Sequence, residues 1–195
     1  MPIKSSRLPR SPVCAVSHLM RYFTHAFAFV VLGLVAVGCA SATRFDSISV
    51  RGSENFRREV SNSLTLLKTK SPSFYATITN NVAVVRTGAR VEIEIHTDAK
   101  PARLLLPASV PTDSTIWRAG VIAHFAYHSH LYRQFLLDHA GIQCVPYNEF
   151  RWRDAEKRCL EFQLGALRDL GAPAGEFARA QSEPHTIENT NPTHP

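Results

Sequence analysis

The stretch Ser114–His139, STIWRAGVIAHFAYHSHLYRQFLLDH, decides the fold because it predicts one long helix that carries three histidines. Ser114 suits the N-cap position, where a hydroxyl accepts a backbone N–H of the first turn. Residues four apart on an α-helix share a face, so His124 and His128 are expected one turn apart on the same side. His130 lies on a different side of the helix from His124 and His128, and it is expected in solvent or at the rim of the core.

The pair His124 and His128 falls on the apolar stripe of this helix, where Trp117, Val121 and Leu131 recur at helical spacing. Two imidazoles at this spacing can reach one zinc ion at about 2.0–2.1 Å. The same spacing also fits two histidines at the edge of the core that are satisfied by hydrogen bonds. Spacing alone therefore leaves a metal site and a metal-free core pair both open.

A later helix, expected over about 153–170, places a carboxylate on its own apolar stripe. Glu156 and Gln163 share a face with Cys159, Leu160, Leu167 and Leu170. A buried carboxylate is costly unless it is paired or ligates a metal, so Glu156 could complete a two-histidine, one-carboxylate zinc set. The alternative is that Glu156 is partly exposed in the first turn, favoured by the helix dipole and paired with Arg153 or a histidine.

The residues of this region that are most useful for comparison with a known protein family are Trp117, Ala119-Gly120-Val121-Ile122, His124, His128 and Leu170-Gly171-Ala172-Pro173. Preceded by an amphipathic helix and a small β region, they resemble small secreted gluzincin-like metallopeptidase domains over about 53–173. The resemblance implies a zincin-like fold in which His124, His128 and a downstream glutamate, here Glu156, hold zinc. Members of that family carry His-Glu-x-x-His, whose glutamate polarises the attacking water.

Phe125 stands where this motif has its glutamate, and no other acidic residue lies within the motif. The resemblance therefore implies a degenerate, non-catalytic domain that retains zinc or serves as a binding module for an envelope protein or peptide. No catalytic residue is predicted. Two alternatives stay open: an active zinc-dependent peptidase of the cell envelope that uses another base, and a structural lipoprotein without metal.

The first 38 residues have the pattern of a bacterial lipoprotein signal. Basic residues precede the apolar run Ala26–Val37, which is too short to span a bilayer comfortably, and Ala36-Val37-Gly38-Cys39 resembles a lipobox. We expect residues 1–38 to be removed and Cys39 to be lipidated, which would anchor the protein to a membrane of the bacterial cell envelope. An uncleaved anchor is the alternative. Translation from Met20 would give a signal of ordinary length.

Removal of that signal changes the charge and the cysteine count. Of 22 basic and 16 acidic residues, 18 and 16 remain, a net charge of +2 with no footprint for nucleic acid. Cys144 and Cys159 then form an even pair in an oxidising compartment. A disulfide between them would be worth roughly 3 kcal/mol. The alternative is two free buried thiols.

The remaining pattern predicts an α+β domain, with a small sheet of about three strands packed against three to four helices around the histidine helix. Residues 39–52 are expected to form a tether and the first strand, and 53–70 a helix capped by Ser53. A shorter helical segment is expected from Ser71 until Gly88 breaks the pattern. Strands are expected at 91–96 and 103–106. The polar segment 174–195 is expected to be a disordered tail.

Overall fold

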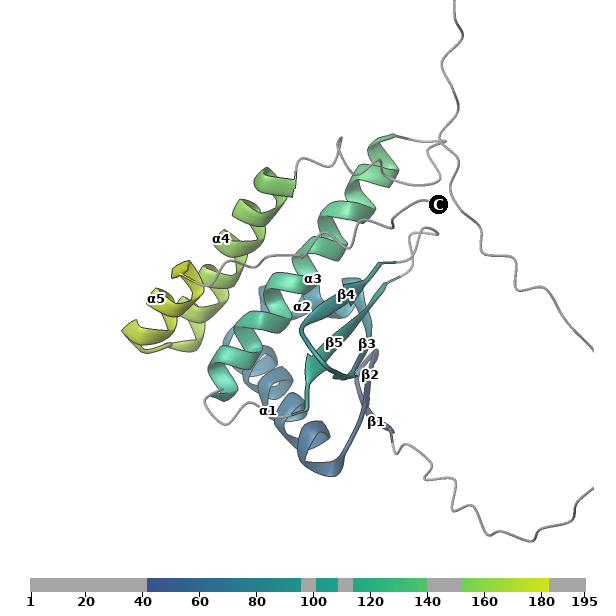
Figure 1. The fold of residues 1–195 in the computed structure, drawn as a ribbon, viewed down its shortest axis with the longest axis vertical. Coiled ribbons are helices and arrows are strands. Elements are labelled where there is room, and N and C mark those ends of the chain that lie inside the picture. The colour runs from purple at the N-terminus through teal and green to yellow at the C-terminus, as the bar shows by residue number, and fades with distance from the viewer. Residues whose placement is uncertain (1–41, 96–100, 109–113, 140–151, 183–195) are drawn as a thin grey trace, which may run out of the picture. The chain divides into compact units, whose positions relative to one another are not determined.

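The computed structural model describes residues 42–95, 101–108, 114–139 and 152–182. They form a mixed sheet and a set of helices, so the predicted α+β class is confirmed (Figure 1). The strands are β1 (Ala42–Phe45), β2 (Ile48–Arg51), β3 (Val82–Gly88), β4 (Glu92–Glu94) and β5 (Ala102–Pro107). The helices are α1 (Glu54–Lys70), α2 (Pro72–Asn81), α3 (Thr115–Asp138), α4 (Trp152–Leu170) and α5 (Ala174–Ser182).

The sheet has the strand order β1-β2-β3-β5-β4. The three central strands β2, β3 and β5 run parallel, while β1 and β4 pair antiparallel at the two edges. On β5 the side chains of Ala102, Leu104 and Leu106 are buried and alternate with more exposed ones. This alternation means that one face of the sheet is covered and the other is open.

Helices α1 and α2 connect the parallel strands β2 and β3. The Ser53 hydroxyl caps α1 by accepting the backbone N–H of Phe56 at 3.3 Å, as the sequence pattern predicts. Pro72 begins α2, where its missing N–H costs nothing. The apolar stripe of α1 recurs every three or four residues and is fully buried, through Phe56, Val60, Leu64 and Leu67.

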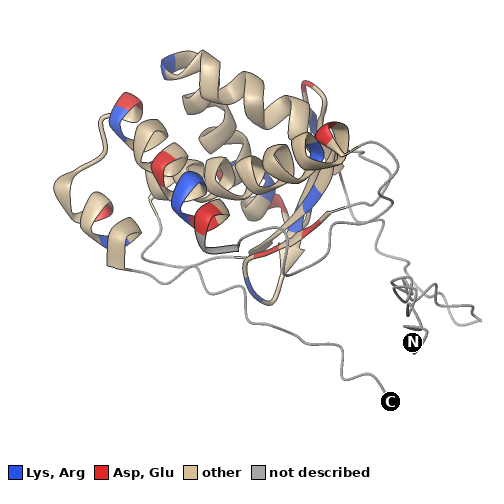
Figure 2. Ribbon diagram, turned by 90° about the horizontal axis from the view of Figure 1, so that it is seen from above, with Lys and Arg blue, Asp and Glu red and all other residues tan. Residues whose placement is uncertain are grey.

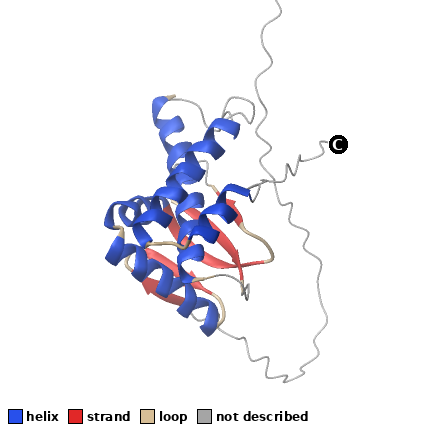
Figure 3. Cartoon of the chain, turned by 90° about the vertical axis from the view of Figure 1, so that its left-hand side faces the viewer, coloured by secondary structure: helices blue, strands red, loops and turns tan. Residues whose placement is uncertain are grey.

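Helix α3 lies in the middle of the described fold, between the sheet and α4 (Figure 1). Figure 3, seen from the helical side, shows the helices in front of the strands. Helix α3 also contacts α1 and α2, so neighbouring elements surround it. Every residue from Trp117 to Ala126 is buried in consequence. The predicted central position of the histidine helix is therefore confirmed, and α4 and α5 form a further layer on the side of α3 away from the sheet.

The sheet is larger than the predicted three strands, because two segments were assigned wrongly from the pattern. The tether was expected up to Thr43 and the first strand from Asp46, but residues 42–45 form a strand of their own, β1, which pairs with β2 across a turn in which Asp46 has a φ of 49°. Residues 82–88, expected to continue a helical segment, form the parallel strand β3. Val82 keeps helical spacing from Ile78, which explains the error, but its run of valines favours a strand.

The prediction of a disordered tail from residue 174 is wrong over Ala174–Ser182, which forms α5. The buried Ala180 and the half-buried Phe177 dock this helix on the rest of the fold. The strand expected at 91–96 shrinks to Glu92–Glu94 at the edge of the sheet. Residues 183–195, the expected signal at 1–38 and the lipidation site Cys39 lie outside the described residues.

Candidate metal centre

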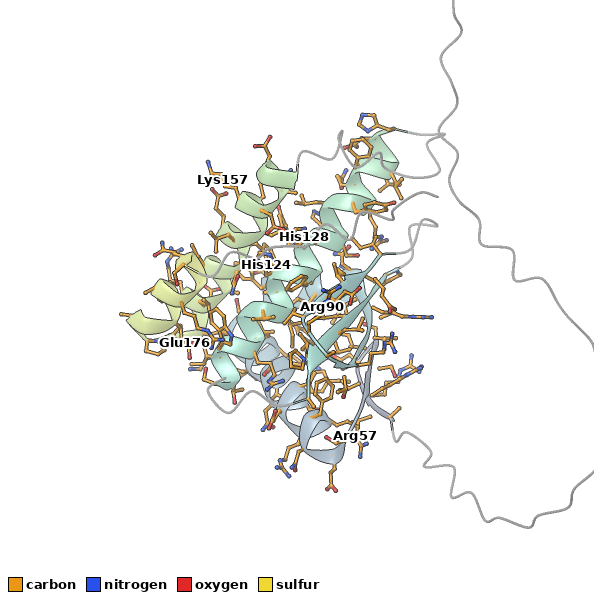
Figure 4. The ribbon with its side chains drawn as sticks, in the orientation of Figure 1. Arg57, Arg90, His124, His128, Lys157 and Glu176 are labelled. Carbon is orange, nitrogen blue, oxygen red and sulfur yellow. The ribbon has the colours of Figure 1, made fainter. Side chains whose placement is uncertain are left out.

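The site forms where α4 crosses the middle of α3. Figure 4 shows His124 and His128 on the side of α3 toward α4. Glu156, in the first half of α4, reaches across the helix interface to both of them. The carboxylate atom Oε2 lies 3.3 Å from His124 Nε2, and Oε1 lies 3.2 Å from His128 Nε2. The two imidazole Nε2 atoms are themselves 3.2 Å apart.

These separations match the spacing of ligands around a small metal ion. Nitrogen and oxygen ligands at about 2.0–2.1 Å from a tetrahedral ion lie roughly 3.3–3.4 Å from one another. His124, His128 and Glu156 thus form a group with metal-ligand geometry, in which one atom from each residue lies within 4.8 Å of the others. Among the described residues no fourth His, Cys, Asp or Glu joins this group.

Burial separates the roles of the three residues. The imidazoles of His124 and His128 are 0% and 1% exposed, whereas the Glu156 side chain is 26% exposed. Glu156 therefore forms the side of the group that solvent reaches. The sequence left open whether Glu156 is a buried ligand or a partly exposed residue paired with a histidine. In the structure it is partly exposed and contacts both histidines.

The carboxylate of Glu156 is held in its ionised form. Burial raises its pKa, but hydrogen bonds and charge interactions with His124 and His128 outweigh this effect and lower the pKa to about 2. An ionised carboxylate and imidazole nitrogens are the donor types that divalent transition metals bind. Metal binding also requires neutral imidazoles, so a bound ion would take the place of the protons that attract the carboxylate in this pairing.

Phe125 lines the imidazole pair with an apolar ring. Its ring centroid lies 5.0 Å from that of His124 and 5.9 Å from that of His128, and its side chain is 7% exposed within the core. The helix position after the first histidine thus supplies packing and no proton-transferring group. Glu156 is the one carboxylate in the group itself.

The other candidate residues lie outside the group. His130 is half-buried, with its ring 5.2 Å from that of Tyr127, and burial together with the charges of Arg158 and Arg133 lowers its pKa. Cys159 is buried and has no disulfide partner among the described residues, and burial raises the pKa of its thiol. Its proposed disulfide partner Cys144 lies outside the described residues, so the bridge stays a prediction.

Gln163 is the one polar anomaly on the same face of α4. It is fully buried, and among the described residues neither its amide nitrogen nor its amide oxygen has a hydrogen-bond partner. It packs near Gly120, which lies one helical turn before His124. The apolar stripe of α4 already contained it, but no sequence signal indicated that its amide would stay unpaired.

Comparison with known proteins adds nothing to this geometry: no family model matches the chain, and neither curated proteins nor solved structures yielded a match. Within the described ranges, none of the helices has the combination of length and apolar composition needed to cross a bilayer.

Proposed function

We propose that the protein is a bacterial envelope lipoprotein that binds zinc through His124, His128 and Glu156 and does not hydrolyse peptides. The observation that carries the proposal is the convergence of two imidazole nitrogens and one carboxylate at 3.2–3.3 Å. Two packed helices hold these groups in place without further folding. A group preorganised in this way loses little conformational entropy when a metal binds.

Zinc is the metal that this donor set favours. Two histidines and one carboxylate, with a further position left for an exogenous ligand, form the ligand pattern of many mononuclear zinc sites. Imidazole also suits iron, copper and nickel, so the identity of the metal has to be measured. The solvent-facing side of Glu156 is the side on which such a further ligand would enter.

The replacement of the motif glutamate by Phe125 argues against peptidase activity, since the one carboxylate that the described residues bring to the imidazoles, Glu156, serves as a ligand. General acid–base catalysis contributes on the order of 10²–10⁴-fold, and it needs a titratable group within hydrogen-bond reach of the reacting proton. Phe125 fills that helix position with a ring packed on both imidazoles. This supports the degenerate zincin-like domain implied by the resemblance, with binding of an envelope peptide or protein in place of cleavage.

Metal content of the purified protein tests the zinc proposal. We expect about one zinc ion per chain, measured by mass spectrometry after dialysis against zinc, and loss of that ion in His128→Ala and Glu156→Ala. His130→Ala is the matched control because its histidine lies on the same helix outside the group. A wild-type protein that stays metal-free would contradict the proposal and favour a structural lipoprotein.

Peptidase assays test whether the zinc-loaded protein hydrolyses peptides. The zinc-loaded wild type should leave envelope peptides intact, while Phe125→Glu places a carboxylate beside the imidazoles and should gain measurable hydrolysis. Hydrolysis by the wild type that disappears in His124→Ala would instead establish the active peptidase.

The membrane part of the proposal rests on the sequence around Cys39. We expect Cys39→Ser to abolish processing and acylation of the precursor, read by its mass and by incorporation of labelled palmitate. Cys14→Ser is the matched control. Cys14 lies before the apolar run and is not preceded by a lipobox such as the one that precedes Cys39. Normal acylation of the Cys39→Ser precursor would exclude this anchor.

A further inference from the structure

The uncovered face of the sheet carries an arginine on each of four neighbouring strands: Arg44, Arg51, Arg86 and Arg103. All four are exposed. The strand register places them on one face, because Arg51 pairs with Arg86 and the neighbours Val50, Val85 and Leu104 are buried on the other. Figure 2 shows basic and acidic positions on these strands in blue and red. We call these four residues the arginine face.

Acidic groups compensate only one side of the arginine face. On the edge strand β4, Glu94 lies 2.7 Å from Arg86 and 4.0 Å from Arg103. At the other edge, Arg44 donates to the carbonyl oxygen of Asp46 and Arg51 to the Ser49 hydroxyl. No carboxylate of the described residues forms an ion pair with either of them. Positive charge is therefore concentrated on β1 and β2.

Folding does not require this arrangement. Arg51 and Arg86 occupy paired positions of neighbouring strands, where like charges repel each other. Between the arginines the face also exposes part of Val84 and Leu105, two aliphatic side chains. Cations surrounding small apolar groups form a surface suited to the headgroup region of a bilayer.

We propose that the arginine face lies against the anionic headgroups of a lipid membrane. The inference rests on the lipid anchor of the proposed function, because Cys39 precedes β1 by only three residues, roughly 10 Å of extended chain. A lipid on Cys39 would hold Arg44 and Arg51 within the range of the negative surface potential. The anchor and the arginines thus act as two signals for one surface.

Vesicle binding of the full chain carrying Cys39→Ser tests the surface without a lipid on Cys39. The probes are vesicles of phosphatidylcholine alone and with one third phosphatidylglycerol. Removing the charges with Arg44→Gln and Arg51→Gln should weaken partitioning to the anionic vesicles by about five-fold per arginine. Binding to neutral vesicles should not change, since every variant keeps residues 1–38.

The matched control removes the same charge from the helices, with Arg58→Gln and Arg168→Gln, both exposed. This control should retain most of the binding, and the charge-conserving pair Arg44→Lys and Arg51→Lys should retain it as well. An equal loss in the helix control would overturn the proposal, because only net charge would then matter.

A second outcome would assign the face to another polyanion. If a DNA duplex competes for Arg44 and Arg51 at lower concentration than the anionic vesicles, the surface binds nucleic acid and the membrane proposal fails. The assay uses a chain with no lipid on Cys39, so it remains informative whether or not Cys39 is acylated in cells. The acylation assay therefore tests the lipid anchor at Cys39, and vesicle binding separately tests the arginine face.

Discussion

Gln163 is buried on α4 seven residues after Glu156, and within the described part of the chain neither polar atom of its amide has a hydrogen-bond partner. Burying an amide without hydrogen bonds costs about 1–3 kcal/mol, as judged from protein mutations. Gln163→Leu, of similar size, should therefore raise the free energy of unfolding by roughly 1–3 kcal/mol. Urea denaturation followed by circular dichroism measures the change.

Gln134→Leu serves as the control, because Gln134 is exposed on α3 and its replacement should change stability by less than about 0.5 kcal/mol. A less stable Gln163→Leu protein would show that the amide has a partner that compensates its burial. Zinc affinity measured on the same variant then separates stability from function. Unchanged affinity would place the amide outside the metal centre.

Asp46 is a residue through which pH should act on stability. Its pKa is lowered by the hydrogen bond that Tyr75 donates at 2.6 Å and by Lys68 at 2.9 Å. A carboxyl group with a lowered folded-state pKa stabilises the fold above its unfolded pKa of about 3.9. This stabilisation is lost as the pH falls through the folded value.

Asp46→Asn should therefore remove part of the acid dependence of unfolding below about pH 4. Tyr75→Phe should do the same, because it removes the larger of the two causes. Thermal unfolding between pH 2 and pH 7 measures both. If thermal stability falls toward acid pH equally in the wild type and both variants, the contact between Asp46 and Tyr75 does not couple folding to pH.

Helical spacing was sufficient at the residue scale to predict that His124 and His128 share a buried face, whereas for Glu156 it left both a core-facing and a partly exposed position open. The actual contact could not be derived in this way, since it depends on how far α3 and α4 slide along each other. The two helices approach closely at Gly120, and such a tertiary contact cannot be derived from the local preferences of either helix.

Close approach of α3 and α4 makes Gly120 a sensitive position at the element scale. A Cβ atom on Gly120 would lie 2.8 Å from Leu167 Cδ2 and 3.5 Å from Gln163 Cγ. Gly120→Ala should therefore push the helices apart and destabilise the protein by about 1–3 kcal/mol. It should also weaken zinc binding, because Glu156 and the histidines come from the two displaced helices.

Gly175→Ala in α5 is the matched control. Nothing lies within 4 Å of the added atom, so the better helix propensity of alanine should stabilise by up to about 1 kcal/mol. Denaturant midpoints of the two variants should move in opposite directions. An unchanged or raised midpoint for Gly120→Ala would mean that packing at Gly120 does not control the helix interface.

The elements that were predicted correctly are those with local signals. Ser53 and Ser114 both cap their helices, and the predicted ranges of α1 and α3 match the structure closely. The missed strands β1 and β3 depend on their neighbours for pairing. A four-residue strand such as β1 has no periodicity of its own to detect, and its hydrogen bonds come from β2.

At the scale of the whole molecule, α5 ties the end of the described chain to the start of the histidine helix. The guanidinium of Arg179 lies 4.0 Å from the ring centroid of Trp117, and the Ser114 hydroxyl donates to Glu176. Ala180 is fully buried. The polar composition after Pro173 gave no indication of this docking, since one cation–π contact, one hydrogen bond and a few apolar residues suffice to dock a short helix.

Shortening the chain tests whether α5 stabilises the metal centre from a distance. The protein ending at Ser182 is compared with the one ending at Pro173, so that the difference reports the loss of α5 alone. Losing the cation–π contact and the packing of Phe177 and Ala180 should lower the free energy of unfolding by roughly 2–4 kcal/mol. The free energy of zinc binding should fall by less than the free energy of unfolding, because His124, His128 and Glu156 all lie outside α5. Equal stability of the two proteins would show that α5 docks without contributing to the fold.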